Sequence, residues 1–481
     1  MRKDGDFKMA SLTDGRLADR LFDVKRFLRG SAPLGDIPPG RAMFRNALLV
    51  AWPSILESFL VALVGVIDTV MVSSLGSYAI AAVGLTTQPK FICLAVFISL
   101  NVAVSALVAR RRGEDDRESA NSILVQALVI TIGLTVVISA AAVIFADPII
   151  RLAGSAEDTH EAAVSYFRII SGGMVFNVLS MVINAAQRGA GNTKIAMRTN
   201  IVSNGVNIIF NYLLIGGHFG FPRLEVAGAA VATVIGTVFA CGMSIFSVLK
   251  KDRFLSLLSV KKIGFDRRSL RSLADLGAST LAEQIFLRIG FLTYAIIVAR
   301  LGTTAFAAHQ VGMNIMSISF SFGDGLSVAA VALVGRSLGE KRQDLAKIYG
   351  AICQRMGLTF SIILCIIYVT CGEMIFTLFS DETVILKYGS MIMDMIAVIV
   401  FMQITQVIYS GCLRGGGDTK FVALVSLVSV AFFRPFSGWL FCYPLGMGLT
   451  GAWIGLAIDQ FCRLAMTFFR FKSGKWTMHK I

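Results

Sequence analysis

The sequence predicts an all-α integral membrane protein in which twelve transmembrane helices form two pseudo-symmetric six-helix lobes. Three observations support this prediction. Hydrophobic residues make up 55% of the 481-residue chain and charged residues only 16%, whereas soluble proteins carry about 25% charged residues. Apolar runs long enough to cross about 30 Å of hydrocarbon recur along the chain. The second half of the chain repeats motifs of the first half at a nearly constant offset.

Twelve apolar runs of about 20–30 residues account for most of the chain, and each is long enough for a transmembrane helix. Several exceed about 25 residues, which indicates helices that tilt in the bilayer or extend beyond it. The runs lie near residues 47–74, 78–109, 121–146, 161–187, 195–217, 226–249, 273–300, 304–335, 348–379, 389–412, 421–443 and 447–469.

The basic residues are distributed unevenly between the two sides of the predicted bundle. Most of the 45 Lys and Arg residues fall in the two terminal segments and in alternate loops, on one side of the membrane. Cytoplasmic loops carry such an excess, so we expect a multi-pass plasma (inner) membrane protein with both termini in the cytoplasm. The net charge of +15 then reflects topology and anionic lipid, and no nucleic-acid partner is expected.

These runs and loops divide the chain into two lobes, a linker and two tails. Each lobe has six helices, an even number, so both lobes enter the membrane in the same sense, as in transporters built from parallel repeats. The predicted segments are the cytoplasmic N-terminal tail 1–46, the N-lobe 47–249, the cytoplasmic linker 250–272, the C-lobe 273–469 and the cytoplasmic C-terminal tail 470–481.

A seven-residue motif occurs in both halves of the chain. Arg188-Gly-Ala-Gly-Asn-Thr-Lys194 returns 226 residues later as Arg414-Gly-Gly-Gly-Asp-Thr-Lys420, and Glu57 matches Glu283 at the same offset. The glycines and the Asn or Asp suit a tight turn between helices. The spacing of a phosphate-binding loop is absent, so we interpret both copies as structural turns.

Asp68 is the strongest functional candidate in the predicted membrane region, where an ionisable residue is costly. It lies eleven residues after Glu57, about 20° from it around a helix, so both share one face. Its counterpart in the second half is Tyr294, and a chemical role can survive in one repeat alone. We favour a proton- or cation-linked role over a structural ion pair. The roles of Glu57 and Glu283 stay open, and Pro53 makes a bend in the first helix plausible.

Four asparagines follow one face of the fifth predicted helix, at spacings of four, three and four residues. A stripe of amides in a membrane must face protein or water. The amides can ligate a hard cation, hydrogen-bond a carboxyl group such as that of Asp68, or join helices by ordinary hydrogen bonds. The pattern leaves these alternatives open. The four residues are Asn200, Asn204, Asn207 and Asn211.

Other ionisable residues lie within or at the ends of the predicted helices, and some of them must pair. The eight cysteines form no CxxC pair and the four histidines are not spaced as metal ligands, so no disulfide framework, zinc site or enzyme is indicated. The ionisable residues are Lys90, Arg168, Arg288, Asp324, Glu373, Asp394, Arg434 and Asp459.

Several short motifs occur in a fixed order: Pro53 with Ile67-Asp-Thr69, Leu75-Gly76 before Ala-rich sequence, Ala307-Ala-His-Gln310, and the doubled turn motif. Together they resemble the multidrug and toxic compound extrusion (MATE) transporters over about residues 42–470. The resemblance implies an antiporter that exports organic cations or other small amphipathic compounds by alternating access. It also implies H⁺ or Na⁺ as coupling ion and no further cofactor. We expect a monomer surrounded by membrane lipids.

The resemblance also implies a cation site in the N-lobe, an acid in the C-lobe and a hinge in the first helix. Na⁺ held at the first-helix aspartate would be the only bound metal. The residues implied are Asp68, Asn177, Asn207 and Asn211 for the cation site, Glu283 for the C-lobe acid, and Pro53 for the hinge.

This chain departs from the family pattern at two positions. Gln403 stands where some members carry a second C-lobe acid, and Asp394, nine residues earlier, falls on the opposite helix face. Asn211 stands where related members carry Asp, which lowers the negative charge of the N-lobe site.

A flippase for lipid-linked precursors, with a similar architecture, is the alternative function. Such a protein needs cationic residues in its cleft to bind a pyrophosphate group. Arg288, Arg300 and Arg434 are candidates for that role.

Overall fold

The computed structural model describes residues 33–250, 253–259, 267–377 and 383–479. These residues form helices and connecting loops without any β-strand, which confirms the predicted all-helical class. Most of the predicted N-terminal tail, residues 1–46, and part of the predicted linker, 250–272, lie outside the described ranges.

Eight helices make up the first half of the described chain. The fourth predicted span is two helices, α6 and α7, that meet at Gly173 and are bent by 48°. The helices are α2 (Gly40–Ser73), α3 (Ser77–Gly113), α4 (Arg117–Ile144), α5 (Ala146–Leu152), α6 (Glu157–Gly172), α7 (Met174–Gly189), α8 (Thr193–Gly216) and α9 (Glu225–Val248).

The second half follows the same plan. Its eleventh span is continuous but changes from α-helix to a π-helical segment, η4 (Ser426–Phe433), and back. Pro435 follows that segment and has no N–H for a regular helical bond. The helices are α10 (Arg267–Ala299), α11 (Thr303–Gly339), α12 (Gln343–Thr377), α13 (Thr383–Gly415), α14 (Thr419–Val425), α15 (Arg434–Cys442) and α16 (Gly448–Ser473).

Among the described residues, nine helices are long and apolar enough to cross a membrane, or ten when the bent pair α6 and α7 counts as one span. Helices α8 and α16 are long enough, with 24 and 26 residues, but their polar residues lower their mean hydropathy. Helix α8 carries the four asparagines, and α16 carries Asp459 and Arg463. With these two included, the twelve-helix, two-lobe architecture fits the chain.

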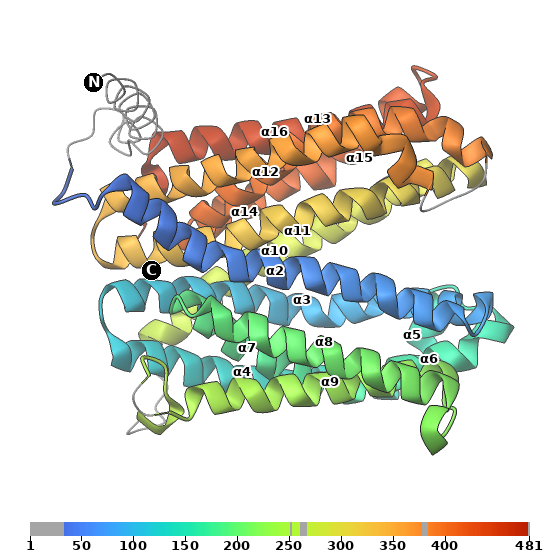
Figure 1. Ribbon diagram of the computed structural model, residues 1–481, viewed down its shortest axis with the longest axis horizontal. Coiled ribbons are helices and arrows are strands. Elements are labelled where there is room, and N and C mark those ends of the chain that lie inside the picture. Colours follow the sequence, from blue (N-terminus) through green and yellow to red (C-terminus); the bar gives the residue numbers. More distant parts are fainter. Residues whose placement is uncertain (1–32, 251–252, 260–266, 378–382, 480–481) are drawn as a thin grey trace, which may run out of the picture.

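The two lobes lie side by side, with α2 and α3 packed against α10 and α11 (Figure 1). Helix α2 begins and α16 ends at the same end of the bundle, here called the terminal end, and the lobes diverge toward the opposite end. At the terminal end the two backbones touch. A Cβ on Gly113 would lie 1.9 Å from the Arg336 carbonyl oxygen, and one on Gly339 would lie 2.0 Å from that of Arg110. Glycine is therefore required at both positions for this contact.

The described part of the linker, residues 253–259, packs on the N-lobe. The backbone N–H of Ser256 donates to the side-chain oxygen Oδ1 of Asn121 at 2.7 Å. The Arg112 guanidinium lies 4.3 Å from the centroid of the Phe254 ring.

Candidate functional site

The doubled turn motif supplies one arginine to each lobe, and each arginine binds the glutamate on the first helix of that lobe. Arg188 donates to Glu57 Oε1 at 2.9 Å, and Arg414 donates to Glu283 Oε1 at 2.5 Å. Each pair is separated by 131 residues in the sequence. Asn200 of α8 adds a second donor to Glu57, at 2.6 Å. The motif thus ties the end of the fourth span to the middle of the first span.

The fifth position of the motif is Asn192 in the first copy and Asp418 in the second, and the structure shows what the aspartate binds. Asp418 accepts from Arg470 at 2.6 Å and lies 3.4 Å from the His479 ring nitrogen, both in the C-terminal segment. Asn192, its counterpart, makes no side-chain cap for α8. The aspartate therefore attaches the chain end to the C-lobe turn.

Asp324 of α11 interacts with residues of both lobes. It accepts a hydrogen bond from Ser58 of α2 at 3.4 Å, across the lobe interface. It also interacts electrostatically with both Arg414 and Arg188. One carboxylate of the C-lobe thus faces the motif arginines of both lobes. We call Glu57, Arg188, Asp324, Arg414 and Glu283 the interlobe ion network.

Asp68 lies eleven residues beyond Glu57 on α2 and has different partners. Asn211 of α8 donates to Asp68 Oδ1 at 2.7 Å. The Asn207 amide, oriented so that its oxygen accepts from the backbone N–H and hydroxyl of Thr233, donates to the same oxygen at 2.9 Å. Among the described residues, no Lys, Arg or His lies within ion-pair distance of Asp68. Two amides therefore fix the carboxylate, and no basic side chain neutralises it by direct contact.

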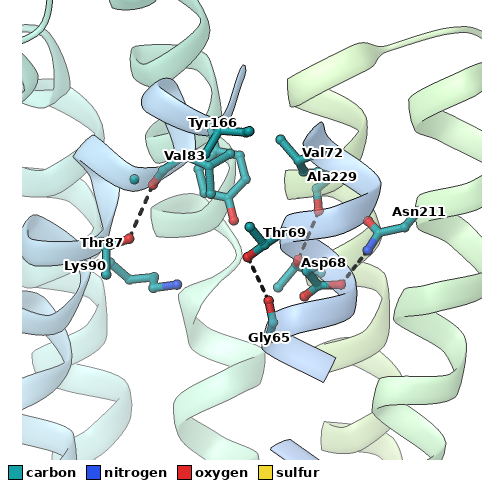
Figure 2. A pocket seen from close by; sticks show the side chains of 13 residues that line it. Gly65, Asp68, Thr69, Val72, Val83, Thr87, Lys90, Tyr166, Asn211 and Ala229 are labelled. Atoms are coloured by element: carbon teal, nitrogen blue, oxygen red, sulfur yellow. Dashed lines mark hydrogen bonds between the residues drawn. The ribbon is translucent and has the colours of Figure 1, made fainter. Parts of the chain in front are cut away.

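Asp68 lines a cavity of about 370 Å³ inside the N-lobe. Figure 2 shows its carboxylate beside Asn211 on one wall, with Lys90 of α3 and the Tyr166 hydroxyl on the facing wall. Lys90 interacts electrostatically with Asp68 across this space. The lining residues are Gly65, Asp68, Thr69, Val72, Ile80, Val83, Gly84, Thr87, Lys90, Tyr166, Asn211, Ala229 and Thr233.

The corresponding place in the C-lobe is filled by large side chains. Tyr294, the counterpart of Asp68, donates to the Ala452 carbonyl at 2.7 Å and is 2% exposed. Its ring packs edge-on against His309, which packs in the same way against Trp453. His309 aligns with Val83, a wall residue of the N-lobe cavity. The duplicated fold therefore has a cavity lined by Asp68, Lys90 and small or apolar residues in the N-lobe, and an aromatic core at the corresponding place in the C-lobe.

The residues predicted for the cation site do not all lie together. Asp68, Asn207 and Asn211 form one hydrogen-bonded cluster. Asn177 lines an adjacent cavity of about 30 Å³, whose wall includes Lys90 and Thr233 of the larger cavity. Glu283 lies elsewhere, paired with Arg414.

Pro53, the predicted hinge, lies within α2, which the structure assigns as one helix from Gly40 to Ser73. Two residues further on, Ile55 contacts α11 closely, because a Cβ on Gly325 would lie 2.4 Å from the Ile55 Cα. The segment after the proline is therefore packed directly against the other lobe.

Sequence reasoning noted Lys90 as an intramembrane charge without a role and did not consider Tyr166 or Thr233. Lys90 lies 22 residues after Asp68, on the next helix. A basic residue inside the span that follows an intramembrane acid is a signal that identifies such a neighbour. Tyr166 and Thr233 have no comparable signal, because hydroxyl groups are common in membrane helices.

The chain matches the MatE family model twice, over residues 53–213 and 280–440. The chain belongs to the MATE family of transporters. The two matched segments correspond to the two lobes. As a MATE protein, the chain is a multi-pass membrane transporter and not an enzyme.

Relatives that are named multidrug resistance proteins are similar to this MATE transporter over most of their length. The probable multidrug resistance protein NorM of Thermotoga maritima is 28% identical over 92% of this chain and 95% of its own length. The multidrug resistance protein MdtK of Edwardsiella ictaluri is 26% identical over 86% of this chain and 92% of its own length.

Solved structures share the fold. An outward-facing multidrug resistance MATE family transporter of the MOP superfamily superimposes with a TM-score of 0.84 at 20% identity, over 90% of this chain and 97% of that chain. A MOP superfamily transporter from Pyrococcus furiosus, described as having a binding pocket of reverse polarity, gives the same TM-score and identity, over 90% and 95%.

No group of three or more His, Cys, Asp or Glu side chains that would hold a metal ion occurs in the described part of the chain. The N-lobe cavity instead offers one carboxylate and several neutral oxygens. The side-chain oxygen of Asn211 is buried without a hydrogen-bond partner among the described residues. Such a set can take a proton, a monovalent cation or the cationic group of an organic molecule.

Proposed function

We propose that this MATE transporter is an H⁺- or Na⁺-coupled antiporter that exports organic cations and other amphipathic compounds across the plasma membrane by alternating access. In this proposal both termini are cytoplasmic, so the terminal end faces the cytoplasm. The cation site consists of Asp68, Asn207 and Asn211, with Asn177 in the adjoining cavity. Relatives that are named multidrug resistance proteins agree with this substrate class.

The observation that carries the proposal is the Asp68 carboxylate, which lines a cavity and has no direct ion pair with any residue that the structure describes. An ionised carboxylate inside a membrane protein attracts a cation, since an unneutralised charge there is costly. Cargo and coupling ion then compete for one negative charge, and the competition couples their movements because binding energies are reciprocal. Walls that include valine, isoleucine and tyrosine suit an amphipathic cargo.

Alternating access is supported by the lobe interface. At the terminal end the backbones of the two lobes contact each other at Gly113 and Gly339, and Asp324 interacts electrostatically with both motif arginines. These contacts must separate for that end to open. They are charged or polar, and water that enters between the lobes can replace them.

One of the three arginines that the flippase alternative requires, Arg434, is not available to bind a ligand. Arg434 is 2% exposed and lies 2.8 Å from Asp459, which is fully buried. Arg463 also pairs with Asp459, at 3.1 Å. A guanidinium held in this way is not available to a pyrophosphate group, so antiport of organic cations is the function that the site supports best.

The direct test uses purified protein in proteoliposomes with a fluorescent organic cation such as ethidium. We expect the dye to accumulate against its own gradient when a proton or sodium gradient is imposed in the opposite direction. Collapse of the gradient with an ionophore should stop accumulation. Dye movement of equal rate with and without either gradient would contradict coupled antiport.

A further inference from the structure

Lys90 shares the N-lobe cavity with Asp68 and has no role in the proposed cation site. We propose that Lys90 carries the coupled proton: its ammonium is the counter-charge of Asp68 in the empty cavity, and it gives up a proton when a cationic cargo takes that place. This inference rests on the proposed function and identifies the coupling ion as H⁺.

The cavity walls carry one acid and one base. Of the thirteen lining residues, all in the described part of the chain, Asp68 and Lys90 are the only charged ones. They come from α2 and α3 and face the same space (Figure 2). With both ionised, the cavity has no net charge. A cation that enters makes the net charge positive unless another positive charge leaves.

The two charged groups differ in how they are held. Asp68 receives hydrogen bonds from two amides of α8. These donors suit an ionised carboxylate, both in the empty cavity and with a cation bound. Lys90 has no hydrogen bond or ion pair among the described residues, and its Nζ lies 5.9 Å from the centroid of the neighbouring Phe91 ring. The ammonium of Lys90 thus depends on Asp68 for a counter-charge, whereas the Asp68 carboxylate is also held by the two amides of α8.

A permanent organic cation at Asp68 removes the counter-charge of Lys90. A lysine ammonium without a counter-charge is unstable inside a membrane protein, and lysine, unlike arginine, releases its proton readily when buried. The ammonium then becomes a neutral amine, and its proton passes to water in the cavity. One positive charge enters and one leaves, so cargo is exchanged for a proton.

The neutral amine of Lys90 can move into the adjoining cavity. It is lined by Lys90 itself, Asn177, Thr233, Thr237 and apolar residues, and its volume of about 30 Å³ is large enough for a group of the size of a water molecule. The Asn177 amide and the Thr237 hydroxyl can hydrogen-bond an amine there. Asn177 therefore acts on the cation site through Lys90 in this proposal.

No other charged group lines the cavity among the described residues; outside it, the Arg288 guanidinium of α10 lies 4.5 Å from the centroid of the Phe91 ring. Helix α6 contributes the Tyr166 hydroxyl, α8 contributes amides and α9 contributes Thr233. The nearest further acid on α9, Glu225, is occupied by Tyr78 at 3.1 Å and Arg223 at 3.4 Å. The proton that leaves on cargo binding thus has Lys90, Asp68 and Tyr166 as its possible sources.

The test measures proton release when purified protein binds tetraphenylphosphonium, a cation that cannot itself titrate. A pH indicator in weakly buffered detergent solution reports the release, and radiolabelled ligand reports binding. We expect wild-type protein to release up to about one proton per cation bound. Lys90→Gln should bind the cation at least as tightly and release none.

Lys90→Arg is the matched control, because arginine keeps the positive charge and cannot lose it. We expect it to release no proton and to bind the cation roughly tenfold more weakly, since its guanidinium stays beside Asp68. Thermal unfolding of each variant establishes that it is folded.

Proton release by Lys90→Gln at the wild-type level would overturn the inference and leave the proposed function intact. Loss of cation binding in folded Lys90→Gln would also overturn it. The proposed function fails separately, if Asp68→Asn binds the cation as wild type does.

Discussion

Asp68→Asn is expected to reduce gradient-driven export of an organic cation by at least about tenfold. Asparagine fits the same space and can still hydrogen-bond Asn207 and Asn211, so the change removes charge and little else. Without the charge, neither cargo nor coupling ion gains electrostatic energy in the cavity, and the two no longer exclude each other. The measurement is the initial rate of ethidium export from cells or everted vesicles, normalised to the amount of membrane-inserted protein.

Asp394→Asn provides the control for Asp68→Asn. It is the same chemical change at another intramembrane aspartate, one that is exposed on α13 and outside the N-lobe cavity. Export by this variant should match wild type. Full export by Asp68→Asn, or an equal loss in both variants, would show that the charge at Asp68 is not the coupling element.

Arg414→Gln is expected to lower the free energy of unfolding by about 3–5 kcal/mol, the usual cost of leaving one partner of a buried ion pair alone. Glu283, which is 2% exposed, would lose the one cationic side chain that lies within ion-pair distance of it in the described part of the chain. Asp324 would lose one of its two arginines. The measurement is thermal or denaturant unfolding of purified protein in a fixed detergent, where this cost appears as a lower midpoint.

The double variant Glu283→Gln with Arg414→Gln tests the cause of this loss. Removing both charges leaves no uncompensated carboxylate, so we expect it to recover most of the stability that Arg414→Gln loses. A double variant as unstable as Arg414→Gln alone would mean that the arginine acts through packing and not through its pair with Glu283.

The architecture was predictable because each span is long and its apolar residues are continuous. The twelve spans and the two-lobe division follow from length and repetition. The details that the sequence did not predict are breaks within spans. The bend at Gly173 and the π-helical segment before Pro435 depend on how a helix packs against its neighbours, and a hydropathy pattern does not contain that information.

The candidate site was predictable where residues share a helix. The spacing of the four asparagines placed Asn207 and Asn211 on one face, and both reach Asp68. Contacts between distant helices were not predictable. The turn arginines were interpreted as part of a loop, yet each reaches a glutamate 131 residues away. Lys90 was seen as a charge, but only the structure places it across a cavity from Asp68.

In the proposed mechanism, cargo and coupling ion exclude each other at one carboxylate. Its most direct test is the equilibrium affinity of purified protein for a permanent organic cation, measured while pH and sodium concentration are varied separately. For wild type, we expect weaker binding as proton or sodium concentration rises, and for Asp68→Asn we expect weak binding that responds to neither ion. Wild-type affinity independent of both ions, or an equal ion dependence in Asp68→Asn, would contradict it.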